Sequence, residues 1–433
     1  MRRARWTILL VPALLYFISY FQRVAPAVVA GDLMAAFAVS AAALGTLSAV
    51  YPYCFAAMAL PGGSLADVLG PRGTLTLGGL SMGGGAILFG LAPAFGVAFA
   101  GRLLVGLGAS VMLIASLRLA AEWFRTDEFA TVAGAAQSVG SLGALASTTP
   151  MALLVEQVGW RHAFVAIGGA TALLAVACFV LVRDRPEAHE APRGVAGAAA
   201  RPPAPGLREV IAGIPNVIAN RRSWTAGLTS GGIYGGFAAF IGLWGVPYIT
   251  QVHGLPRVQA ANLVALAAVG LLVGAPLIGW LSDRVLERRR LPLVAVSALN
   301  VLAWLPLTLP ATPVAAVWLA PVCFLIGLSA SVVVLVFACI REVNDPRYVG
   351  VALGFHNFPA FIFFGLTQWL TGVVLDRLWD GTLAGGVRVY SADAYRAAFA
   401  LCLALALGAF LSACLVTETR CRNIWGDARL GLR

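Results

Sequence analysis

The chain has 433 residues, of which 60% are hydrophobic and only 11% are charged. Soluble globular domains carry roughly 25% charged residues, so this composition excludes an ordinary soluble protein. A membrane-spanning helix needs about 20 mostly apolar residues, and a chain of this length can hold twelve of them with short loops and one longer linker. The predicted fold class is therefore all-α, a polytopic membrane protein with twelve transmembrane helices.

The net charge of +11 comes entirely from arginine, because none of the 30 basic residues is lysine. The arginines fall in short clusters between apolar runs and do not alternate with aromatic residues, which argues against a nucleic-acid partner. The seven cysteines include no Cys-x-x-Cys pair and most lie in apolar runs, so we predict neither disulfides nor a metal site. No cofactor is predicted. The predicted partners are the lipid bilayer and a small-molecule substrate, with a coupling proton or ion as a further candidate.

Apolar runs predict the spans in chain order. Their approximate limits are residues 6–28, 43–65, 73–93, 96–120, 130–154, 161–182, 223–250, 258–281, 292–310, 314–339, 348–375 and 396–416. The first run follows a basic start and could be mistaken for a cleaved signal peptide. It is long and contains Tyr16, Tyr20 and Arg23, so we predict that it stays as the first span.

Residues 183–222 are rich in Arg, Ala and Pro and show no apolar periodicity, which predicts a partly disordered cytoplasmic linker. The linker divides the spans into an N-terminal six-helix bundle, 1–182, and a C-terminal six-helix bundle with a short tail, 223–433. With both termini in the cytoplasm, 22 of the 30 arginines lie on the cytoplasmic side and five on the other. The positive-inside rule therefore predicts cytoplasmic termini, and we expect a bacterial inner membrane.

The two predicted halves share short motifs at nearly constant offsets. Gly63-Ser-Leu-Ala-Asp67 follows the second span, and Gly279-Trp-Leu-Ser-Asp283 follows the eighth, 216 residues later. The segment Gly106–Val111 recurs as Gly327–Val332. Further matched pairs are Glu122 with Glu342 and Gln137 with Asn357. Related halves around a midplane site are typical of secondary transporters.

These motifs resemble those of the major facilitator superfamily over essentially the whole chain. The chain matches the loop motif G-x-x-x-D-x-x-G-x-R in its first half, and matches it more loosely in its second half. It also matches the fourth-span motif R-x-x-x-G-x-G. The matching residues are Gly63, Asp67, Gly70 and Arg72, then Gly279, Asp283 and Arg284, then Arg102, Gly106 and Gly108. The tract from Tyr16 to Arg72 and the loop from Trp379 to Tyr395 also resemble bacterial organic-solute permeases akin to anion:cation symporters and lysosomal dipeptide carriers.

The loop motifs predict a conformational latch. A loop carboxylate can cap the N-terminus of a helix in the opposite half, which is worth about 0.3 to 1 kcal/mol. We expect Asp67 near Tyr348 and Asp283 near Phe129, at the starts of the eleventh and fifth spans. The alternative is that both aspartates simply end helices and fix the topology. The predicted latch residues are Gly63, Asp67, Arg72, Gly279, Asp283, Arg284, Glu122 and Glu342.

Arg23 is the most informative single residue. A guanidinium in a span costs about 2.5 to 3.5 kcal/mol unless it faces a wet cavity or a partner. Tyr16 and Tyr20 lie on the same helix face. The family resemblance implies that the first span lines the cavity and that Arg23 contacts a carboxylate or phosphate of the substrate, together with both tyrosines. Two alternatives remain open: Arg23 reaches the outer interface, or it pairs with Asp32.

Four more polar or aromatic residues are candidate substrate contacts. Gln137 and Asn357 occupy matched positions, so both either face the central cavity or form interhelical hydrogen bonds. Tyr234 and Trp244 are candidates for the walls of a site, with ordinary packing as the alternative.

Two residues are candidates for coupling. His356 lies well inside a predicted span, whereas His162 is at the edge of one, and a histidine titrates near neutrality, so His356 is either a proton carrier or a packing residue. Arg102 either takes part in coupling or donates hydrogen bonds to carbonyls of neighbouring helices.

We predict a secondary active transporter that moves a small organic solute by alternating access. A positive buried residue favours an anionic or zwitterionic substrate: a carboxylate, amino acid, small peptide or phosphate ester. No Asp or Glu lies in the middle of a predicted span, which disfavours export of cationic drugs. The chain lacks a phosphate-binding loop and an H-E-x-x-H motif, so we predict that it is not an enzyme. The alternatives are a drug or metabolite exporter, and a transporter-like sensor or assembly factor.

Overall fold

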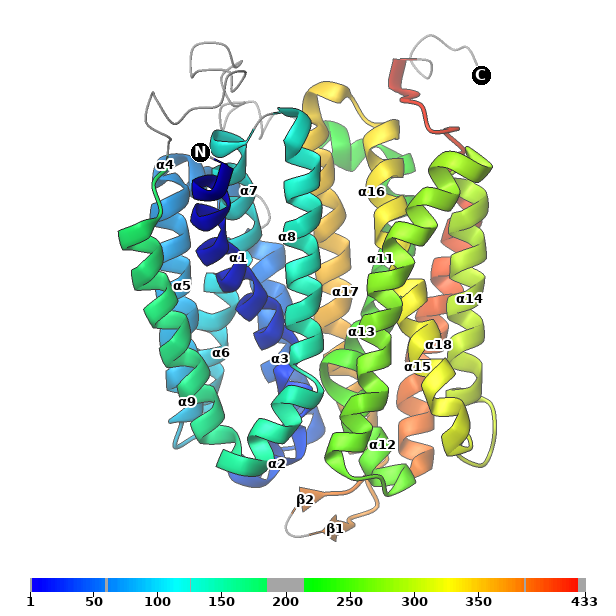
Figure 1. Cartoon of the computed structure of the whole chain (residues 1–433). Coiled ribbons are helices and arrows are strands. Elements are labelled where there is room, and N and C mark those ends of the chain that lie inside the picture. The colour runs from blue at the N-terminus through cyan, green and yellow to red at the C-terminus, as the bar shows by residue number, and fades with distance from the viewer. Residues whose placement is uncertain (1, 59–60, 125, 185–213, 385–386, 427–433) are drawn as a thin grey trace. The chain divides into compact units, whose positions relative to one another are not determined.

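The computed structural model describes residues 2–58, 61–124, 126–184, 214–384 and 387–426, which are almost entirely helical (Figure 1). The first half of the chain forms α1 (Arg2–Val24), α2 (Ala30–Phe37), α3 (Ala41–Met58), α4 (Pro61–Val68), α5 (Gly70–Gly90), α6 (Phe95–Ser110), α7 (Met112–Trp123), α8 (Thr126–Ala146) and α9 (Thr149–Leu181). A 3₁₀ turn at Ala25–Ala27 follows α1.

The second half forms α11 (Arg221–Ala239), α12 (Gly245–His253), α13 (Arg257–Trp280), α14 (Arg290–Thr308), α15 (Leu319–Ala330), α16 (Val332–Val343), α17 (Val349–Arg377) and α18 (Ala392–Leu415). Two π-helical segments, Phe240–Trp244 and Leu281–Leu286, continue α11 and α13. Short 3₁₀ turns lie at Ala316–Trp318 and Pro346–Tyr348. The strands β1 (Leu383–Ala384) and β2 (Val387–Arg388) pair antiparallel, with Leu383 opposite Arg388.

Among the described residues, ten helical stretches are long and apolar enough to cross a membrane. Two further helices, α5 and α8, have 21 residues each and are richer in Gly, Ser and Thr. Together these stretches account for the twelve predicted spans. The prediction of an all-α polytopic membrane protein is therefore confirmed.

The fourth and tenth spans break at nearly equivalent places, one residue apart in the repeated segment. Val111 separates α6 from α7, and Ser331 separates α15 from α16. Both breaks lie in the repeated Gly-Leu-x-Ala-Ser-Val segment. The fifth and sixth spans meet inside α9 at Gly159, whose φ of 76° and ψ of 155° interrupt the helix. Glycine is favoured here because other residues rarely adopt such a positive φ.

The chain divides into two compact units. Unit 1 contains Met1–Val24 and Ala57–Arg208, and unit 2 contains Ala25–Ala56 and Glu209–Arg433. The segment Ala25–Ala56, which carries α2 and most of α3, therefore groups with the second half of the chain. The expected bundles, 1–182 and 223–433, stay a prediction.

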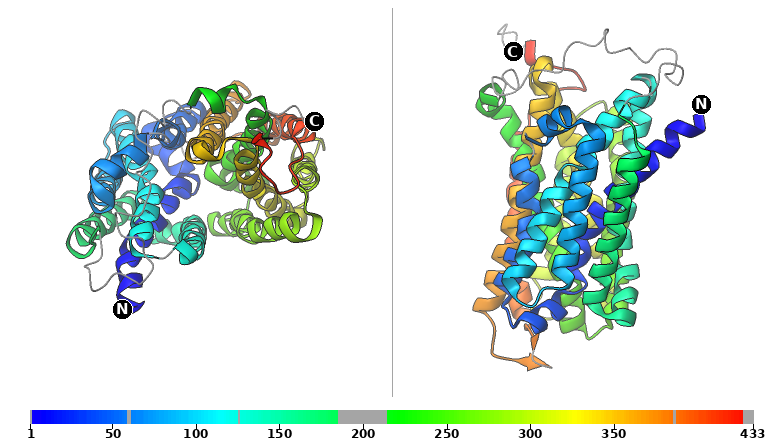
Figure 2. Two further views of the ribbon diagram at one scale, coloured as in Figure 1. Left: turned by 90° about the horizontal axis from the view of Figure 1, so that it is seen from above. Right: turned by 90° about the vertical axis from the view of Figure 1, so that its left-hand side faces the viewer.

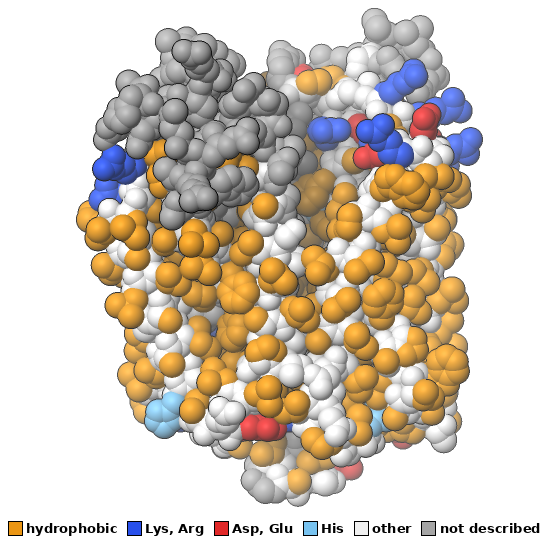
Figure 3. Space-filling view, viewed as in Figure 1, with side chains coloured by type: hydrophobic (Ala, Val, Ile, Leu, Met, Phe, Trp, Pro, Cys, Tyr) orange, Lys and Arg blue, Asp and Glu red, His pale blue; other side chains and the backbone are white. Residues whose placement is uncertain are grey.

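Most of the long helices within each unit run roughly along one direction, and α1 is inclined to the others of its unit (Figure 2). In unit 1, α5 packs between α6 and α9, and α1 packs against α8. In unit 2, α11 packs against α17 and α18, and α13 packs against α15. The flanks of unit 2 expose large apolar side chains such as Leu302 and Leu411, 58% and 63% exposed, and Figure 3 shows this apolar surface. Such a surface suits contact with lipid.

The end of the predicted linker 183–222 lies in the described part of the chain. Residues 214–219 are helical and α11 begins at Arg221, so the end of this segment is folded. Val217 is 2% exposed and belongs to an apolar core with residues of α11 and α16, against which Ile214 also packs. These apolar side chains give residues 214–219 a contact with the core of unit 2. Residues 185–213 lie outside the described part of the chain.

Neighbouring glycines of α5 allow a matched test of helix packing. A Cβ on Gly85 would lie 2.6 Å from the carbonyl oxygen of Gly101 on α6, whereas a Cβ on Gly84 would meet nothing within 4 Å. We expect Gly85→Ala to destabilise the fold by about 1 to 3 kcal/mol through overpacking, and Gly84→Ala to be neutral or slightly stabilising. Thermal unfolding in detergent measures both. Equal effects would contradict this packing.

Candidate functional site

Arg23 lies near the end of α1 and is 6% exposed. Its guanidinium carbon is 4.0 Å from the centroid of the Tyr20 ring, and that ring meets the Tyr16 ring edge to face at 5.0 Å. A cation over an aromatic face is attracted by the ring quadrupole. The structure therefore groups the three predicted residues of the first span.

Glycines of α8 set the position of these rings. A Cβ on Gly140 would lie 2.7 Å from Cε1 of Tyr16 and 3.2 Å from Cδ2 of Tyr20. A Cβ on Gly143 would lie 2.1 Å from the carbonyl oxygen of Phe17. Any larger side chain would separate the two helices, so the tyrosine positions depend on these small residues.

Arg102, which is 1% exposed, donates a hydrogen bond from Nη1 to the carbonyl oxygen of Gln22 on α1 at 2.8 Å. A hydrogen bond to a carbonyl of a neighbouring helix is the alternative to a coupling role that we considered for Arg102. It also brings a second guanidinium to the residue that precedes Arg23. Neither α1 nor α6 contains an Asp or Glu, so these two helices contribute positive charge only.

Gln22 is a candidate site residue that we did not predict from the sequence. Its side chain is fully buried, and among the described residues neither its amide nitrogen nor its amide oxygen has a hydrogen-bond partner. Buried amides without a partner are uncommon and need an explanation, such as a bound ligand or water. The sequence did contain an indication of this role, because Gln22 is a polar residue next to Arg23 inside an apolar run.

A mostly apolar cavity of about 180 Å³ lies between α1, α7 and α8. Tyr16 and Ser116 are its hydroxyl-bearing lining residues, with Leu9, Ala13 and Val139 among the apolar ones. The Ser116 hydroxyl is buried and has no partner among the described residues. Tyr16 therefore lies at the boundary between this cavity and the ring contact with Tyr20.

The predicted contacts of the second half occupy different environments. Trp244 is fully buried at the end of the π-helical segment and donates from Nε1 to the carbonyl oxygen of Gln368 at 3.5 Å. The Tyr234 ring lies 5.6 Å from the ring of Phe237. Asn357 is half-buried on α17. The side chain of Gln137 lies outside the described residues.

His356 is fully buried on α17, with its ring centroid 4.2 Å from that of Phe337. Within the described part of the chain, neither ring nitrogen has a hydrogen-bond partner. This contact is of the packing type, and it does not test whether His356 carries a proton.

A charge network joins two predicted latch residues of unit 2 through Arg289. Nη2 of Arg289 lies 2.8 Å from Oε1 of Glu342, and Nη1 contacts Oδ1 of Asp283. The side chains of Arg289 and Glu342 are 6% and 4% exposed, whereas Asp283 is 56% exposed. Asp283 and Glu342 are both predicted latch residues. Arg289 is not one of them, and the predicted Arg284 is exposed.

The segment after α18 packs onto this network. Glu418 accepts hydrogen bonds from the backbone N–H groups of Arg289 and Arg290 at 2.9 and 3.0 Å, and so caps α14. Burial by itself would raise the pKa of Glu418, but these backbone hydrogen bonds hold it below its ordinary value. The Thr419 hydroxyl donates to Glu342 at 2.5 Å.

Unit 1 uses a related contact. Asp184, just after α9, accepts a hydrogen bond at 2.7 Å from the backbone N–H of Arg72 at the start of α5. The Arg72 guanidinium lies over the Phe179 ring at 4.2 Å. A carboxylate that follows the last span of each half thus caps the third span of that half.

The remaining latch predictions are only partly described. Gly63 lies in α4, Gly279 lies in α13 and Glu122 is half-buried near the end of α7. The side chains of Asp67 and Phe129 lie outside the described residues, so their expected contacts stay predictions. Asp32, one proposed partner of Arg23, forms an ion pair with Arg257 at 2.9 Å.

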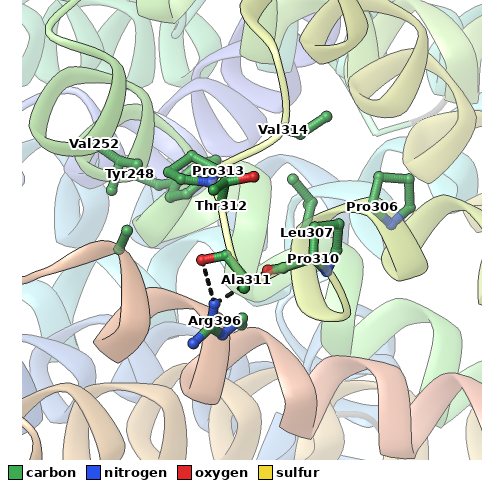
Figure 4. Close-up of a pocket in the computed structure, with 11 residues that line it drawn as sticks. Tyr248, Val252, Pro306, Leu307, Pro310, Ala311, Thr312, Pro313, Val314 and Arg396 are labelled. Carbon is green, nitrogen blue, oxygen red and sulfur yellow. Dashed lines mark hydrogen bonds between the residues drawn. The ribbon is translucent and has the colours of Figure 1, made fainter.

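A shallow pocket lies beside the start of α18, and Arg396 is one of the residues that line it (Figure 4). Arg396 donates from Nη1 to the carbonyl oxygens of Pro310 and Ala311 at 3.1 and 2.7 Å, and pairs with Asp393. These bonds anchor the loop before α15, so this pocket is not our candidate substrate site. Among the described residues, no group of three His, Cys, Asp or Glu could hold a metal ion.

The fold and these buried polar groups define a multi-pass membrane protein with repeated halves. The sequence profile of the Major Facilitator Superfamily matches residues 13–366, and the chain belongs to this family.

Among its relatives, a probable sulfoacetate transporter of Cupriavidus necator is 27% identical over 298 residues, 66% of each chain. This match therefore spans just under two thirds of the relative. A membrane sensor protein of Salmonella typhimurium is 25% identical over 400 residues, 85% of this chain and 84% of the sensor.

The crystal structure of a bacterial homologue of the human lysosomal transporter Spinster, in an inward-facing and unoccupied conformation, has the same fold. Its TM-score is 0.75 at 16% identity, over 95% of this chain and 98% of that one.

The charge network gives a stability prediction. Arg289→Met would leave the Glu342 carboxylate buried without its cation, so we expect a loss of about 3 to 5 kcal/mol. The double variant Arg289→Met/Glu342→Met should recover most of that loss. Asp283→Asn should cost less than about 1 kcal/mol, because exposed pairs are worth little. Thermal unfolding in detergent checks all three, and a cost for Asp283→Asn equal to that of Arg289→Met would contradict the analysis.

Proposed function

We propose that the chain is a secondary transporter that carries a small organic anion across a bacterial inner membrane by alternating access. The observation that carries this proposal is Arg23, a guanidinium that is 6% exposed inside a membrane-spanning helix. A charge is expensive in the bilayer and usually marks a substrate pathway when it is kept there.

The surroundings of Arg23 suit an anion. A guanidinium can bind a carboxylate or a related oxyanion through two parallel hydrogen bonds. The buried amide of Gln22 offers a further donor, and the bond from Arg102 to the Gln22 carbonyl adds positive charge nearby. With no acidic residue in α1 or α6 to receive an ammonium group, a plain anion is favoured over a zwitterion.

The relatives support the same substrate class. The name of the Cupriavidus necator relative assigns it sulfoacetate, which is a small organic anion. Because the match covers only part of that protein, we take from it the charge and size of the substrate and not its identity.

A sensor is the second candidate function. The Salmonella typhimurium relative, a membrane sensor protein, matches this chain over a longer stretch than the sulfoacetate transporter does. A sensor would bind an anion at the same residues without releasing it on the other side. Vesicle uptake separates the two functions, because only a transporter moves the anion into the lumen.

Coupling to a proton or ion stays a prediction. His356 and Arg102 remain the candidate residues, and their observed contacts are of the packing and helix-linking types. A transporter without coupling would still exchange or equilibrate its substrate.

Arg23→Gln should abolish uptake of small organic anions, because it removes the positive charge and the paired donors of the site. The measurement is uptake of short mono- and dicarboxylates and sulfonated carboxylates into proteoliposomes that contain the purified variant. We expect at least a hundredfold loss, in line with the roughly 3 kcal/mol that a lost charge-assisted hydrogen bond can cost. Gln22→Leu should give a smaller loss in the same direction.

Arg161→Gln is the matched control, since Arg161 donates to the carbonyl oxygen of Ala92 at 2.7 Å outside the proposed site. It should transport at a rate close to that of the unaltered protein. Normal uptake by a folded, membrane-inserted Arg23→Gln variant would refute the proposal.

A further inference from the structure

The segment Ala25–Ala56 belongs to the first half of the chain but packs within unit 2. Its main helix, α3, continues to Met58, past the boundary with unit 1 at Ala57. A movement of the two predicted halves against each other must therefore either carry this segment along with the second half or break its contacts there. Those contacts are therefore candidates for interactions that form in one conformation and break in another.

Asp376, at the end of α17, caps the start of α3. Oδ1 accepts a hydrogen bond from the backbone N–H of Ala41 at 3.0 Å, and Oδ2 accepts one from that of Ala42 at 2.7 Å. The Asp376 side chain is 17% exposed. A carboxylate at a helix N-terminus satisfies free N–H groups and meets the positive end of the helix dipole. This cap joins positions more than 330 residues apart in the sequence.

Side chains from the loop before α18 complete the cap. The Tyr390 hydroxyl donates to Oδ1 of Asp376 at 2.9 Å, and Nη1 of Arg388 lies 3.2 Å from the same oxygen. Burial and the Asp376 carboxylate raise the pKa of Tyr390, so its hydroxyl stays protonated and can donate. Gln251 holds this loop in place, because its Oε1 accepts from the Tyr390 backbone N–H at 3.0 Å.

Below the cap, α3 and α17 meet through small residues. A Cβ on Gly45 would lie 2.6 Å from the carbonyl oxygen of Gln368, and one on Gly372 would lie 2.4 Å from that of Ala41. Smooth surfaces of this kind allow close approach without fixing it through hydrogen bonds. The hydrogen bonds of the Asp376 cap are therefore the part of the contact between α3 and α17 that depends on direction.

A second polar contact of the segment is weaker. Asp32 pairs with Arg257 at the start of α13, but their side chains are 27% and 30% exposed. Partly exposed ion pairs contribute little to stability. Asp376 is less exposed and accepts two backbone hydrogen bonds, so it dominates the polar attachment of the segment.

We propose that Asp376 is a latch that holds the second span to the eleventh on the non-cytoplasmic side in one state of the transport cycle and releases it in the other. This inference rests on the proposed function, because only an alternating-access protein needs to release the contact. By the arginine distribution, the loops that contain Arg257 and Arg388 lie on the non-cytoplasmic side.

Labelling of a cysteine at Ser48 tests the latch. Ser48 is 3% exposed and follows Gly45 by three residues, on the α3 face that meets α17. Ser48→Cys is introduced together with Cys54→Ser, Cys414→Ser and Cys421→Ser, because Cys54 also lies on α3 and the other four native cysteines are buried elsewhere. The rate of reaction with a membrane-impermeant maleimide, added from outside, then reports release of α3.

Asp376→Asn should speed this labelling roughly two- to fivefold, the range expected when a helix N-terminus loses the negative charge beside it. Tyr390→Phe should act in the same direction with a smaller effect, and it tests the latch if Asp376→Asn does not fold. Asp380→Asn is the matched control, because Asp380 lies in the same loop and accepts a local hydrogen bond from the Thr382 N–H. It should leave the rate unchanged.

Unchanged labelling in folded Asp376→Asn and Tyr390→Phe proteins would overturn the latch. Labelling needs no substrate, so the latch and the proposed function fail separately. Faster labelling in a protein that moves no anion would leave the latch standing and refute the anion transport. Normal transport with unchanged labelling would leave the anion transport standing and refute the latch.

Discussion

The cost of placing charge in a bilayer governs this structure. Ionised side chains are expensive in hydrocarbon, so each one inside or beside a span must be paired, capped or used. Arg289 and Glu342 form an ion pair, and Asp376 and Glu418 each cap the N-terminus of a helix. Arg23, buried over the Tyr20 ring inside a span, is the residue that we propose as a substrate contact. The anion-transport proposal rests on the burial of this guanidinium inside a membrane-spanning helix.

The sequence predicted the features that depend on composition and repetition. Apolar runs located the spans, and the repeated Gly-Leu-x-Ala-Ser-Val segment lies where the fourth and tenth spans break. Asp283 and Glu342, both predicted as latch residues, contact the same guanidinium, that of Arg289. In each case the predicted property is set by local composition or by duplication of a local pattern, which a single sequence contains.

Other features depend on tertiary contacts and could not be predicted in this way. Arg289, rather than Arg284, turns inward because the chain reverses at Glu287, whose φ is 48°, and delivers Arg289 next to Glu342. The grouping of Ala25–Ala56 with the second half depends on small residues of α3 and α17 that meet across a long sequence separation. Gln22 was overlooked because the missing partners of an amide become visible only in three dimensions.

The central claim is that the site binds small organic anions, and ligand-dependent stability tests it most directly. The purified protein is heated in detergent with each of a panel of short carboxylates and sulfonates, and with their neutral amides. A ligand at a hundred times its dissociation constant stabilises the folded state by about 2.7 kcal/mol, which gives a measurable shift of the melting temperature. We predict that at least one anion raises the melting temperature while its neutral amide does not. Equal shifts with an anion and its amide, or none with any anion, would contradict the account.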